Sequence, residues 1–539
     1  MVLHGESSLT VPTAKPARPL VASLSVSLLT VFLLATLMLA GGCARLPPLD
    51  NRQSSLAIPA QETITTRLGG SIASRVDEHP GASGIYPLAD PMDAFAARAL
   101  LTEAADQSLD IQYYIWQGDT TGLLLMRSLL SAADRGIRVR LLMDDNGIRG
   151  LDRYFAVLNS HPNIEVRLFN PFVVRNPKWV NYFTDFVRIN RRMHNKSFTA
   201  DNQATIIGGR NIGDEYFGAT DGVLFADLDV LAVGPVVVDV SNDFDLYWNS
   251  QSSYPAELIL AEPSTADTEA VVNTLEQVGK SREARDYLRT LQDTNLLQAL
   301  LTGQLKLEWA PTVMVSDDPA KALDRAPVTG LLSRQLLEAL GSPQQRVTLV
   351  SPYLIPTGAG VELFRRLVAR GVEVQILTNA LEATDMAAVH AAYAKYREPL
   401  LEAGVVLYEL RKVAGDAGET KGGSAPFGSS GSSLHAKTFA VDGEQLFVGS
   451  FNFDPRSTHL NTELGFVINS PVLASAIDEA FLEDVPMRAY QVKLDSRGNL
   501  YWLEQAEGRN LIHGHEPNTT LGKRVMVFLM SLLPIEPLL

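Results

Sequence analysis

The chain has 539 residues, of which 46% are hydrophobic and 20% are charged. It is long enough for about two or three packed domains, and its composition excludes a mainly disordered protein. The formal net charge of −15 weighs against a nucleic-acid partner, because a polyanion would be repelled unless basic residues gather at one site.

The N-terminal stretch has the pattern of a targeting segment. Lys15 and Arg18 precede an apolar run from Leu20 to Ala40, which leads into LAGGC ending at Cys43. This ending resembles a bacterial lipoprotein signal, in which the leader is removed and the cysteine is lipidated. The alternative is an uncleaved transmembrane anchor, since about 20 apolar residues can span a bilayer. Both interpretations place the protein at a membrane of the bacterial cell envelope.

Cysteine usage supports the lipoprotein interpretation. Cys43 is the only cysteine of the chain, which excludes an intramolecular disulfide and a cysteine-based metal cluster. A lone cysteine in an exported protein is explained more simply as a lipid attachment point than as a stray thiol. Residues 43–84 are rich in Pro, Ser, Thr, Gly and Gln with weak periodicity, which predicts a flexible tether.

An internal duplication follows and predicts the architecture. Each copy contains an alternating apolar strand, a helix that stops at Arg-Gly, a second strand, further helical sequence and a third strand. A basic last turn with glycine just beyond it is typical of a helix end. The first copy has strands at residues 108–116, from 136, and at 164–169, with a helix at 121–135; the second has strands at 346–356, from 371, and at 405–410, with a helix at 360–370.

This order of elements is that of parallel βαβ units covered by helices. We therefore expect an α/β fold of two pseudo-symmetric halves. For the sequence between them, a plain helical connector is favoured over a lid. The predicted parts are a signal segment (1–42), a tether (43–84), a first half (85–250), a connector (251–330), a second half (331–490) and a C-terminal tail (491–539).

Each half ends in the same string of polar residues. HNKSFTADNQATIIGGRN and HAKTFAVDGEQLFVGSFN both have the form His-x-Lys, four residues, Asp, six residues, Gly-(Gly/Ser)-x-Asn. One copy would be a modest signal, but two copies at corresponding places are hard to attribute to chance. The residues are His194, Lys196, Asp201, Gly208, Gly209 and Asn211 in the first copy, and His435, Lys437, Asp442, Gly449, Ser450 and Asn452 in the second.

Together the two copies supply groups suited to a phosphodiester. In a strand, residues two apart share a face, so each His-x-Lys presents an imidazole beside an ammonium. The glycine turn lets the backbone approach closely and brings in an amide. Lysines and amides can hold the phosphate charge, one neutral histidine can attack phosphorus, and the other can protonate the leaving oxygen. The alternative is a pair of buried core histidines, and the repeated context argues against it.

A histidine in either role needs a partner, usually a carboxylate, on its other ring nitrogen. Glu463 stands eight residues before Pro471, and Asp227 stands eight residues before Pro235. These two acids are the predicted orienting groups, with Asp229 as a fallback in the first half.

The repeated motifs resemble the HKD signature of the phospholipase D superfamily over residues 85–488, and the sequence before the second motif resembles bacterial cardiolipin synthases. The resemblance implies mixed sheets flanked by helices, an active site between the halves, and a two-step phosphatidyl transfer through a phosphohistidine that needs no metal or other cofactor. By the same analogy His194 is the nucleophile, and His435 is the acid that later serves as base. The motif aspartates, Asp201 and Asp442, would be structural and would pair near the site without touching substrate.

Two features near the C-terminus have competing interpretations. His513 and His515 suggest a zinc site, but the surrounding sequence offers no further ligands. Lys523 and Arg524 precede an apolar run at residues 525–533 that is too short to cross a bilayer. We expect this run either to lie in the membrane interface, where basic residues meet anionic lipid, or to pack as a core helix.

The leading hypothesis is a membrane-attached phosphatidyltransferase that makes cardiolipin, with a phospholipid as donor and a lipid head-group alcohol as acceptor. With water as acceptor, the same site would be a phospholipase D. An endonuclease shares the chemistry but is disfavoured by the net charge, and a non-catalytic lipid-binding scaffold is disfavoured by intact motifs in both halves. The expected partners are a phospholipid substrate and a membrane surface, without nucleic acid, and the sequence indicates no protein partner.

Overall fold

The computed structural model describes residues 45–220, 224–282, 284–285, 287–288, 296–412, 432–506 and 508–539. The expected signal segment and Cys43 lie outside these residues. The described residues fall into two compact units, one containing residues 45–46 and 173–186 and the other containing those of ranges 47–172 and 187–539. In the smaller unit, η1 (Lys178–Val180) leads into α7 (Asn181–Thr184). Both large sheets and every predicted catalytic residue belong to the larger unit.

The first half is built on a nine-stranded sheet of order β10-β1-β8-β6-β5-β2-β3-β4-β9. Its centre is a parallel trio, β2 (Ser108–Ile115), β3 (Arg138–Gly147) and β4 (Ile164–Phe169), joined by α5 (Thr120–Asp134) and α6 (Asp152–Asn159). This is the predicted strand–helix series. The other strands are β1 (Ser83–Leu88), β5 (Ser197–Ala200), β6 (Ala204–Gly208), β8 (Asp229–Val233), β9 (Ser253–Pro255) and β10 (Glu308–Ala310). The other helices are α4 (Pro91–Ala104), α8 (Phe186–Ile189), α9 (Asp214–Phe217), α10 (Pro235–Trp248), η2 (Ala256–Leu258), α11 (Thr265–Val278) and α13 (Leu296–Leu301).

The second half repeats this plan on a ten-stranded sheet of order β11-β18-β17-β16-β12-β13-β14-β19-β20-β21. Its parallel trio is β12 (Arg346–Val350), β13 (Glu373–Asn379) and β14 (Val406–Leu410). The helices between these strands are α15 (Thr357–Ala369), α16 (Ala387–Ala394) and α17 (Arg397–Glu402). The other strands are β11 (Thr312–Ser316), β16 (Thr438–Val441), β17 (Gln445–Gly449), β18 (Leu464–Asn469), β19 (Ala489–Leu494), β20 (Leu500–Ala506) and β21 (Arg509–His513). The remaining helices are η3 (Pro319–Leu323), η4 (Val328–Gly330), α14 (Leu332–Leu340), α18 (Pro455–His459), α19 (Pro471–Glu483), α20 (Val485–Arg488), α21 (Leu521–Ser531) and η5 (Glu536–Leu538).

The helices begin and end as the local sequence predicts. The Asp119 side chain accepts the N–H of Gly122 at the start of α5, which stabilises a helix N-terminus. Gly136, just beyond α5, has a φ of 91°, and Gly371, just beyond α15, has a φ of 88°. Glycine is favoured in this left-handed conformation because it has no Cβ. The two Arg-Gly helix ends are therefore confirmed.

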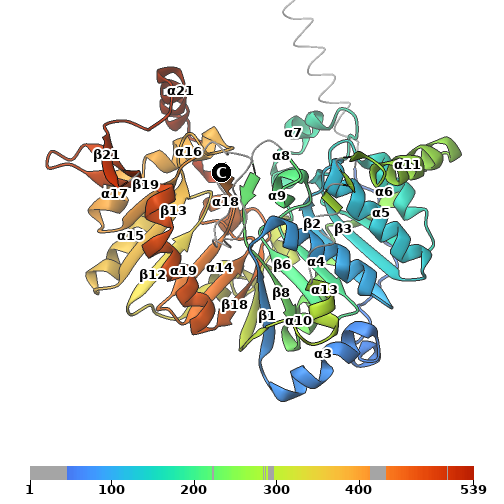
Figure 1. Ribbon diagram of the computed structural model, residues 1–539. Helices are drawn as coiled ribbons and strands as arrows, with labels where there is room; N and C mark the ends of the chain where they lie inside the picture. The colour runs from blue at the N-terminus through green and yellow to red at the C-terminus, as the bar shows by residue number, and fades with distance from the viewer. Residues whose placement is uncertain are drawn as a thin grey trace, which may run out of the picture. The chain divides into compact units, whose positions relative to one another are not determined.

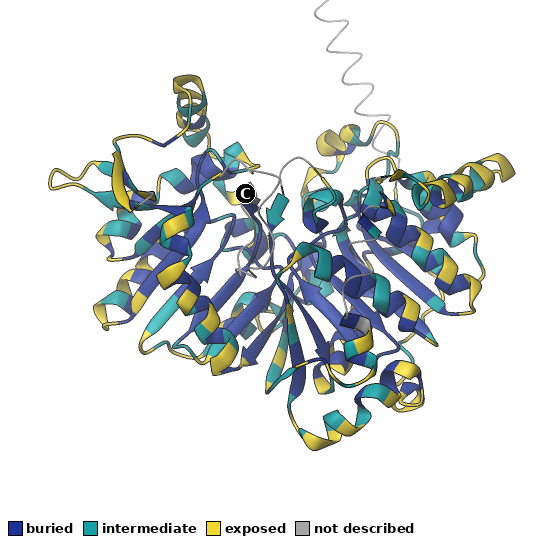
Figure 2. Cartoon of the chain, in the orientation of Figure 1, coloured by how far each residue is buried: buried dark blue, intermediate teal, exposed yellow. Residues whose placement is uncertain are grey.

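An apolar core joins the two halves. A single buried cluster contains Ile207 and Val230 of the first half together with Val448 and Phe466 of the second. Burial of each large apolar side chain contributes about 1.5–3 kcal/mol, so the halves form one packed body. Figure 1 shows the two sheets side by side with helices on their outer faces, and Figure 2 shows buried strands beneath helices whose outer surfaces are exposed. The expected α/β fold of two mixed sheets flanked by helices is confirmed.

The flexible tether expected over residues 43–84 is wrong from residue 60 onward. This stretch forms α2 (Ala60–Thr63) and α3 (Arg67–Glu78), and Leu68 and Ile72 are buried in the core of the first half. Two glycines in RLGGSIASRVDE conceal the helix, because glycine is a poor helix former. Gly69 is required here, since an added Cβ would lie 2.5 Å from the Thr63 carbonyl oxygen.

The connector and the tail also take part in the sheets. Within the connector, β10 pairs with β1 of the first sheet and β11 pairs with β18 of the second. Within the tail, β20 and β21 extend the second sheet beyond β19, and α21 follows them. The strands β9, β10 and β11 of the connector are short, of 3, 3 and 5 residues, so they give little periodic signal in the sequence. The connector is therefore more than a helical link, and the tail is folded.

Candidate active site

The histidines of the two motifs lie at equivalent ends of their sheets. His194 lies just before β5, which runs antiparallel to β2 with Ser197 opposite Gln112. His435 lies just before β16, which pairs in the same way with β12. Each histidine thus reaches the carboxyl ends of the parallel strands, where α/β folds place their sites. The His-x-Lys residues precede a strand, whereas the sequence suggested that they lie within one.

Short backbone ladders hold each histidine against the opposite half. The N–H of His194 donates to the carbonyl of Thr462 at 2.8 Å. In the other direction, β15 (Ser432–Leu434) pairs in parallel with β7 (Leu224–Ala226), and the N–H of His435 donates to the carbonyl of Ala226 at 2.7 Å. The residue after Thr462 and the residue after Ala226 are both acids.

Each histidine is hydrogen-bonded through Nδ1 to an acid of the opposite half. Glu463 Oε2 lies 2.8 Å from His194 Nδ1, and Asp227 Oδ2 lies 2.5 Å from His435 Nδ1. Both acids are buried, and the histidines are 7% and 6% exposed. A hydrogen bond at Nδ1 fixes the ring and leaves Nε2 available for chemistry. The two acids that the proline spacing singled out are therefore hydrogen-bonded to the two histidines. Each acid binds the histidine of the half that does not contain it.

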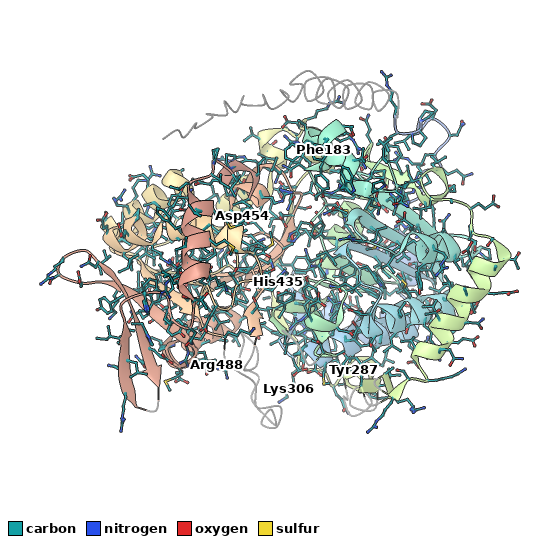
Figure 3. The ribbon with its side chains drawn as sticks, turned by 90° about the horizontal axis from the view of Figure 1, so that it is seen from above. Phe183, Tyr287, Lys306, His435, Asp454 and Arg488 are labelled. Atoms are coloured by element: carbon teal, nitrogen blue, oxygen red, sulfur yellow. The ribbon has the colours of Figure 1, made fainter. Side chains whose placement is uncertain are left out.

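The motif of each half acts on the histidine of the other half, because Lys437 lowers the pKa of His194 and Lys196 lowers that of His435. Burial lowers the pKa of His194 well below its ordinary value, and Lys196, Lys437 and His435 lower it further. The pKa of His435 is also lowered, by burial and then by Lys437, against the raising effect of the Asp227 carboxylate. In the view from above in Figure 3, His435 lies at the junction of the two halves. Both imidazoles are therefore neutral near pH 7 in the free protein.

The motif lysines are buried beside the histidines. Lys196 is 1% exposed, and its Nζ donates to the His194 carbonyl at 2.6 Å. Lys437 is also 1% exposed, and its Nζ lies 2.9 Å from His435 Nδ1. Burial lowers the pKa of Lys196 to about 7 and that of Lys437 to about 8, although neighbouring carboxylates oppose this shift. An anion in the site would stabilise both ammonium groups.

The Gly-(Gly/Ser) step of the motif supports the acid differently in the two halves. Ser450 Oγ donates to Glu463 Oε2 at 2.5 Å. In the first half the corresponding residue is Gly209, where an added Cβ would lie 2.1 Å from Asp227 Oδ1. Burial raises the pKa of Glu463 to about 7. Burial would also raise the pKa of Asp227, but its histidine and lysine neighbours outweigh burial and lower it.

The two motif asparagines have different surroundings. Asn211 Oδ1 accepts the N–H of Ile115 at 3.1 Å, and its Nδ2 donates to Tyr216 Oη at 3.0 Å. Asn452 is 4% exposed, and its Oδ1 has no hydrogen-bond partner among the described residues. Because a buried amide oxygen without a partner is costly, Asn452 is better placed than Asn211 to bind a substrate.

The motif aspartates lie at the far ends of β5 and β16 from the histidines. Asp201 accepts the backbone N–H groups of Asp106, Gln107 and Ser108, and Asp442 accepts those of Gln344, Gln345 and Arg346. Both therefore hold loops, and the expectation that they pair near the site is wrong. Asp229, the fallback acid, is bound instead by Arg98 at 2.7 Å.

His513 and His515, for which the sequence offered no further zinc ligands, lie in ordinary polar surroundings. His513 Nε2 lies 2.8 Å from Glu504 Oε2, and His515 is exposed. Within the described ranges, no group of three or more His, Cys, Asp and Glu side chains is arranged to hold a metal ion.

Comparisons with known proteins agree with this architecture. The family described as cardiolipin synthase, PLD-like domain, matches residues 98–248 and 336–485, together more than half of the chain. The chain belongs to this family. Cardiolipin synthase C of Escherichia coli is 48% identical over 473 residues, covering 88% of this chain and 100% of that protein. Cardiolipin synthase A of Pseudomonas entomophila is 27% identical over 413 residues, covering 76% and 70% of the two chains. The crystal structure of phosphatidylserine synthase from Haemophilus influenzae covers 86% of this chain and 99% of that one with a TM-score of 0.52 at 13% identity, which shows a shared fold.

The two segments that match the cardiolipin synthase family each contain one histidine and one orienting acid. His194 and Asp227 lie in the first segment, and His435 and Glu463 lie in the second. Because the hydrogen bonds run between segments, neither family domain holds a complete histidine–acid pair by itself.

Aromatic residues that sequence reasoning missed stand against the histidines of this cardiolipin synthase-family site. The Tyr114 ring lies edge-on to His194 with ring centroids 5.1 Å apart. The rings of Tyr216 and Phe225 lie 5.3 and 5.1 Å from that of His435. The signal was available for Tyr114, because it lies one residue before the end of the first strand of the repeat.

A second missed pair positions the residue before each histidine. Asp144, near the end of β3, accepts the N–H of Met193 at 2.8 Å. Asn379, at the end of β13, exchanges two hydrogen bonds of 2.9 Å with the backbone of Leu434. The two residues occupy corresponding places in GIRVRLLMDD and GVEVQILTNA. An alignment of the two repeats in the sequence brings these two residues to the same position.

Proposed function

We propose that the chain is a phosphatidyltransferase that makes cardiolipin from two phospholipids. The main observation in support is that each motif histidine is hydrogen-bonded to an acid of the other half, beside two buried lysines. The 48% identity to a protein named cardiolipin synthase C, over that protein's whole length, supports the same activity. A non-catalytic lipid-binding scaffold would not require two oriented imidazoles.

His194 is the proposed nucleophile. Its lowered pKa leaves the Nε2 lone pair unprotonated at neutral pH. Its partner Glu463 has a pKa raised to about 7, so the pair does not strongly favour an imidazolium. In the first step Nε2 bonds to the donor phosphorus, and the bond from phosphorus to the head-group oxygen breaks.

His435 is the proposed acid and base. The lowered pKa of Asp227 keeps that carboxylate ionised, so it favours a proton on His435, and a bound phosphodiester anion favours it further. His435, neutral in the free protein, therefore takes up a proton from solvent when the substrate binds. His435 gives this proton to the leaving oxygen. It then takes a proton from the acceptor hydroxyl as that oxygen attacks phosphorus and the bond from phosphorus to His194 breaks. Both imidazoles return to their starting states.

The remaining motif side chains are proposed to bind the phosphate. Lys196 and Lys437 are buried ammonium groups beside the two imidazoles, and Asn452 adds an amide. In a water-poor site such charges stabilise the extra negative charge of the transition state more strongly than they would in water.

A membrane surface is the proposed setting, and α21 supports it. Val527 packs against Leu381 and Ala391, while the rest of the helix is amphipathic, with Lys523 and Arg524 in its first turns. The exposed apolar residues here are Leu521, Val525, Met526, Phe528, Leu529, Leu532 and Leu533, each at least 43% exposed. Such a surface next to basic residues favours the interfacial interpretation over a core helix. None of the described helices is long and apolar enough to cross a bilayer.

Lipidation at Cys43 is the proposed attachment to the envelope. The sequence LAGGC supports it. Labelling of growing cells with radioactive palmitate is expected to mark the wild type and to leave Cys43→Ala unlabelled. Equal labelling of the two proteins would contradict a lipid at this cysteine.

The proposed activity is tested by giving the purified chain vesicles of phosphatidylglycerol, with and without phosphatidylethanolamine, and analysing the lipids by mass spectrometry. Cardiolipin is expected from the wild type and none from His194→Ala. Phosphatidic acid as the sole product would identify a phospholipase D instead. If neither lipid formed, both proposals would fail.

A further inference from the structure

Tyr353 and Asp385 form a polar pair on the second half's side of the site. Tyr353 lies three residues beyond the end of β12, and its Oη donates to Asp385 Oδ2 at 2.7 Å. Asp385 stands in the loop between β13 and α16 and is exposed, whereas Tyr353 is half-buried. Neither residue belongs to the repeated motifs or to the crossed histidine–acid pairs.

The segments that carry this pair are tied to the second motif. The hydroxyl of Ser351, two residues before Tyr353, accepts the N–H of Phe453 at 3.0 Å. Phe453 directly follows the motif asparagine. At the start of the Asp385 loop, Asn379 holds Leu434, the residue before the motif histidine. The backbone that places the catalytic groups of the second half thus also places this pair.

The Asp385 carboxylate acts on groups of the active site. It raises the pKa of Lys437, against the burial that lowers that pKa to about 8. It also adds to the effect of burial in raising the pKa of Tyr216, which stands against His435. The pKa of Tyr353 is raised well above its ordinary value by burial and Asp385, and also by Tyr216 and Tyr114. The backbone of Leu354, next to Tyr353, forms a bridge with Phe453, which follows the motif asparagine, so the pair stands at the end of the second sheet where that motif lies.

The corresponding region of the first half is different. Tyr114, at the end of β2, receives its hydrogen bond from the neutral amide of Asn146 at 3.4 Å. The Lys196 Nζ lies 5.8 Å from the centre of its ring. Tyr114 thus faces an amide and a cation, whereas Tyr353 donates to a carboxylate. Among the residues that the structure describes, Asp385 on the other side has no cation within ion-pair distance.

A carboxylate beside a phosphodiester site repels the phosphate, so its presence needs another reason. Hydrogen-bond donors on a head group supply one, because ionised carboxylates accept strong hydrogen bonds from hydroxyl groups. We propose that Tyr353 and Asp385 form the acceptor subsite, which binds hydroxyl groups of an incoming polyol head group and presents one of them to His435. This inference rests on the proposed function and names the residues that select its acceptor.

The subsite favours an alcohol over water as the acceptor of the phosphatidyl group. Asp385 accepts from one hydroxyl of the head group while a neighbouring hydroxyl lies at His435. His435 removes the proton of that second hydroxyl as its oxygen attacks phosphorus and the bond from phosphorus to His194 breaks. Water makes no comparable pair of contacts, so it competes poorly while the subsite is occupied.

The test compares Asp385→Asn and Tyr353→Phe with the wild type on vesicles of phosphatidylglycerol. The readout is the ratio of cardiolipin to phosphatidic acid. We expect the ratio to fall about tenfold in Asp385→Asn, since a hydrogen bond to a charged acceptor is weakened. A smaller fall is expected in Tyr353→Phe, which keeps the carboxylate. With deuterated glycerol and ethanol at equal concentration, the wild type should transfer mainly to glycerol, and Asp385→Asn should lose that preference.

Glu382→Gln is the matched control. It lies in the same loop, and its carboxylate accepts from Tyr490 Oη at 2.9 Å on β19, so it should leave both the ratio and the glycerol preference unchanged. If Asp385→Asn lowered both products together at a constant ratio and kept the glycerol preference, the pair would be only structural and the subsite would be overturned. A wild type that transfers to no alcohol at all would instead show failure of the proposed function itself.

Discussion

The two halves carry the same motif but support their histidines by different chemistry. His194 is paired with a glutamate that also receives the Ser450 hydroxyl and whose pKa is raised to about 7 by burial. His435 is paired with an aspartate whose pKa is lowered by its histidine and lysine neighbours, which outweigh burial. The first arrangement suits an imidazole that shares its lone pair with phosphorus. The second suits an imidazole that carries a proton.

The crossing of the acids adds a second lesson. Each half contributes a histidine to the site and an acid for the histidine of the other half. A single half would therefore hold an imidazole without its orienting carboxylate. The duplication produced an interdependent pair of halves, and the difference between the two histidines is open to direct tests.

The largest expected effect separates nucleophile from acid. With phospholipid substrate, His194→Ala and His435→Ala should each lose activity by a factor on the order of 10⁴. With a nitrophenyl phosphodiester, whose leaving group needs no proton, His435→Ala should regain a burst of nitrophenolate and His194→Ala should not. Rapid-mixing absorbance measures the burst. A burst from His194→Ala, and none from His435→Ala, would reverse the two assignments.

The next effect tests the acids. Asp227→Asn and Glu463→Gln should each lower kcat by about a hundredfold or more, because each removes the carboxylate that orients the histidine of the other half. The Asp227 carboxylate raises the pKa of His435. Asp227→Asn should therefore lower that pKa and move the alkaline limb of the pH–rate profile to lower pH. If the alkaline limb did not move in Asp227→Asn, Asp227 would not control the protonation of the residue that donates the proton.

A smaller effect tests the buried lysines. Because the pKa values of Lys196 and Lys437 are about 7 and about 8, both amines become protonated ammonium groups as the pH falls through these values. Dimethyl phosphate keeps one negative charge throughout, so its binding should strengthen by roughly tenfold between about pH 9 and pH 6. Calorimetric titration measures the affinity. Lys437→Met should bind more weakly and lose the upper part of this dependence, and a wild-type affinity independent of pH would contradict the lysine assignment.

The smallest effect on activity is expected for the motif aspartates. Asp201 is buried and Asp442 is partly exposed. Asp201→Ala should lower the free energy of unfolding by about 2–3 kcal/mol, and Asp442→Ala by about 1–2 kcal/mol, since each loses charge-assisted hydrogen bonds to three N–H groups. Urea unfolding measures both losses. A large drop in kcat at unchanged stability would place these carboxylates in the chemistry after all.

Features that repeat could be predicted from the sequence. The strand–helix series and the Arg-Gly helix ends follow from local periodicity and glycine chemistry, and both recur in the second half. Asp227 and Glu463 could be paired because β8 and β18 keep a constant spacing to the proline that begins the next helix. Because the two halves repeat one plan, the spacing from the acid to the proline is the same in both.

Features that depend on contacts between the halves could not be predicted. The crossing is made by a three-residue ladder of β7 with β15 and by an isolated bridge of Met193 with Thr462, which are too short to leave a pattern. Tyr353 and Asp385 have no counterparts in the first half, so a search for repeated residues passes over them. The helix α3 was missed because its glycines weaken its helix propensity.

We propose that the two imidazoles act on one phosphorus atom. The most direct test stops the enzyme with detergent at alkaline pH, where a phosphohistidine is stable, during turnover of a lipid with a ³²P-labelled phosphodiester, and then maps the labelled peptides. We expect at most one phosphohistidine per chain, located at His194 and absent from His194→Ala. Two labelled histidines per chain, or label that persists in His194→Ala, would show that the halves act as separate sites.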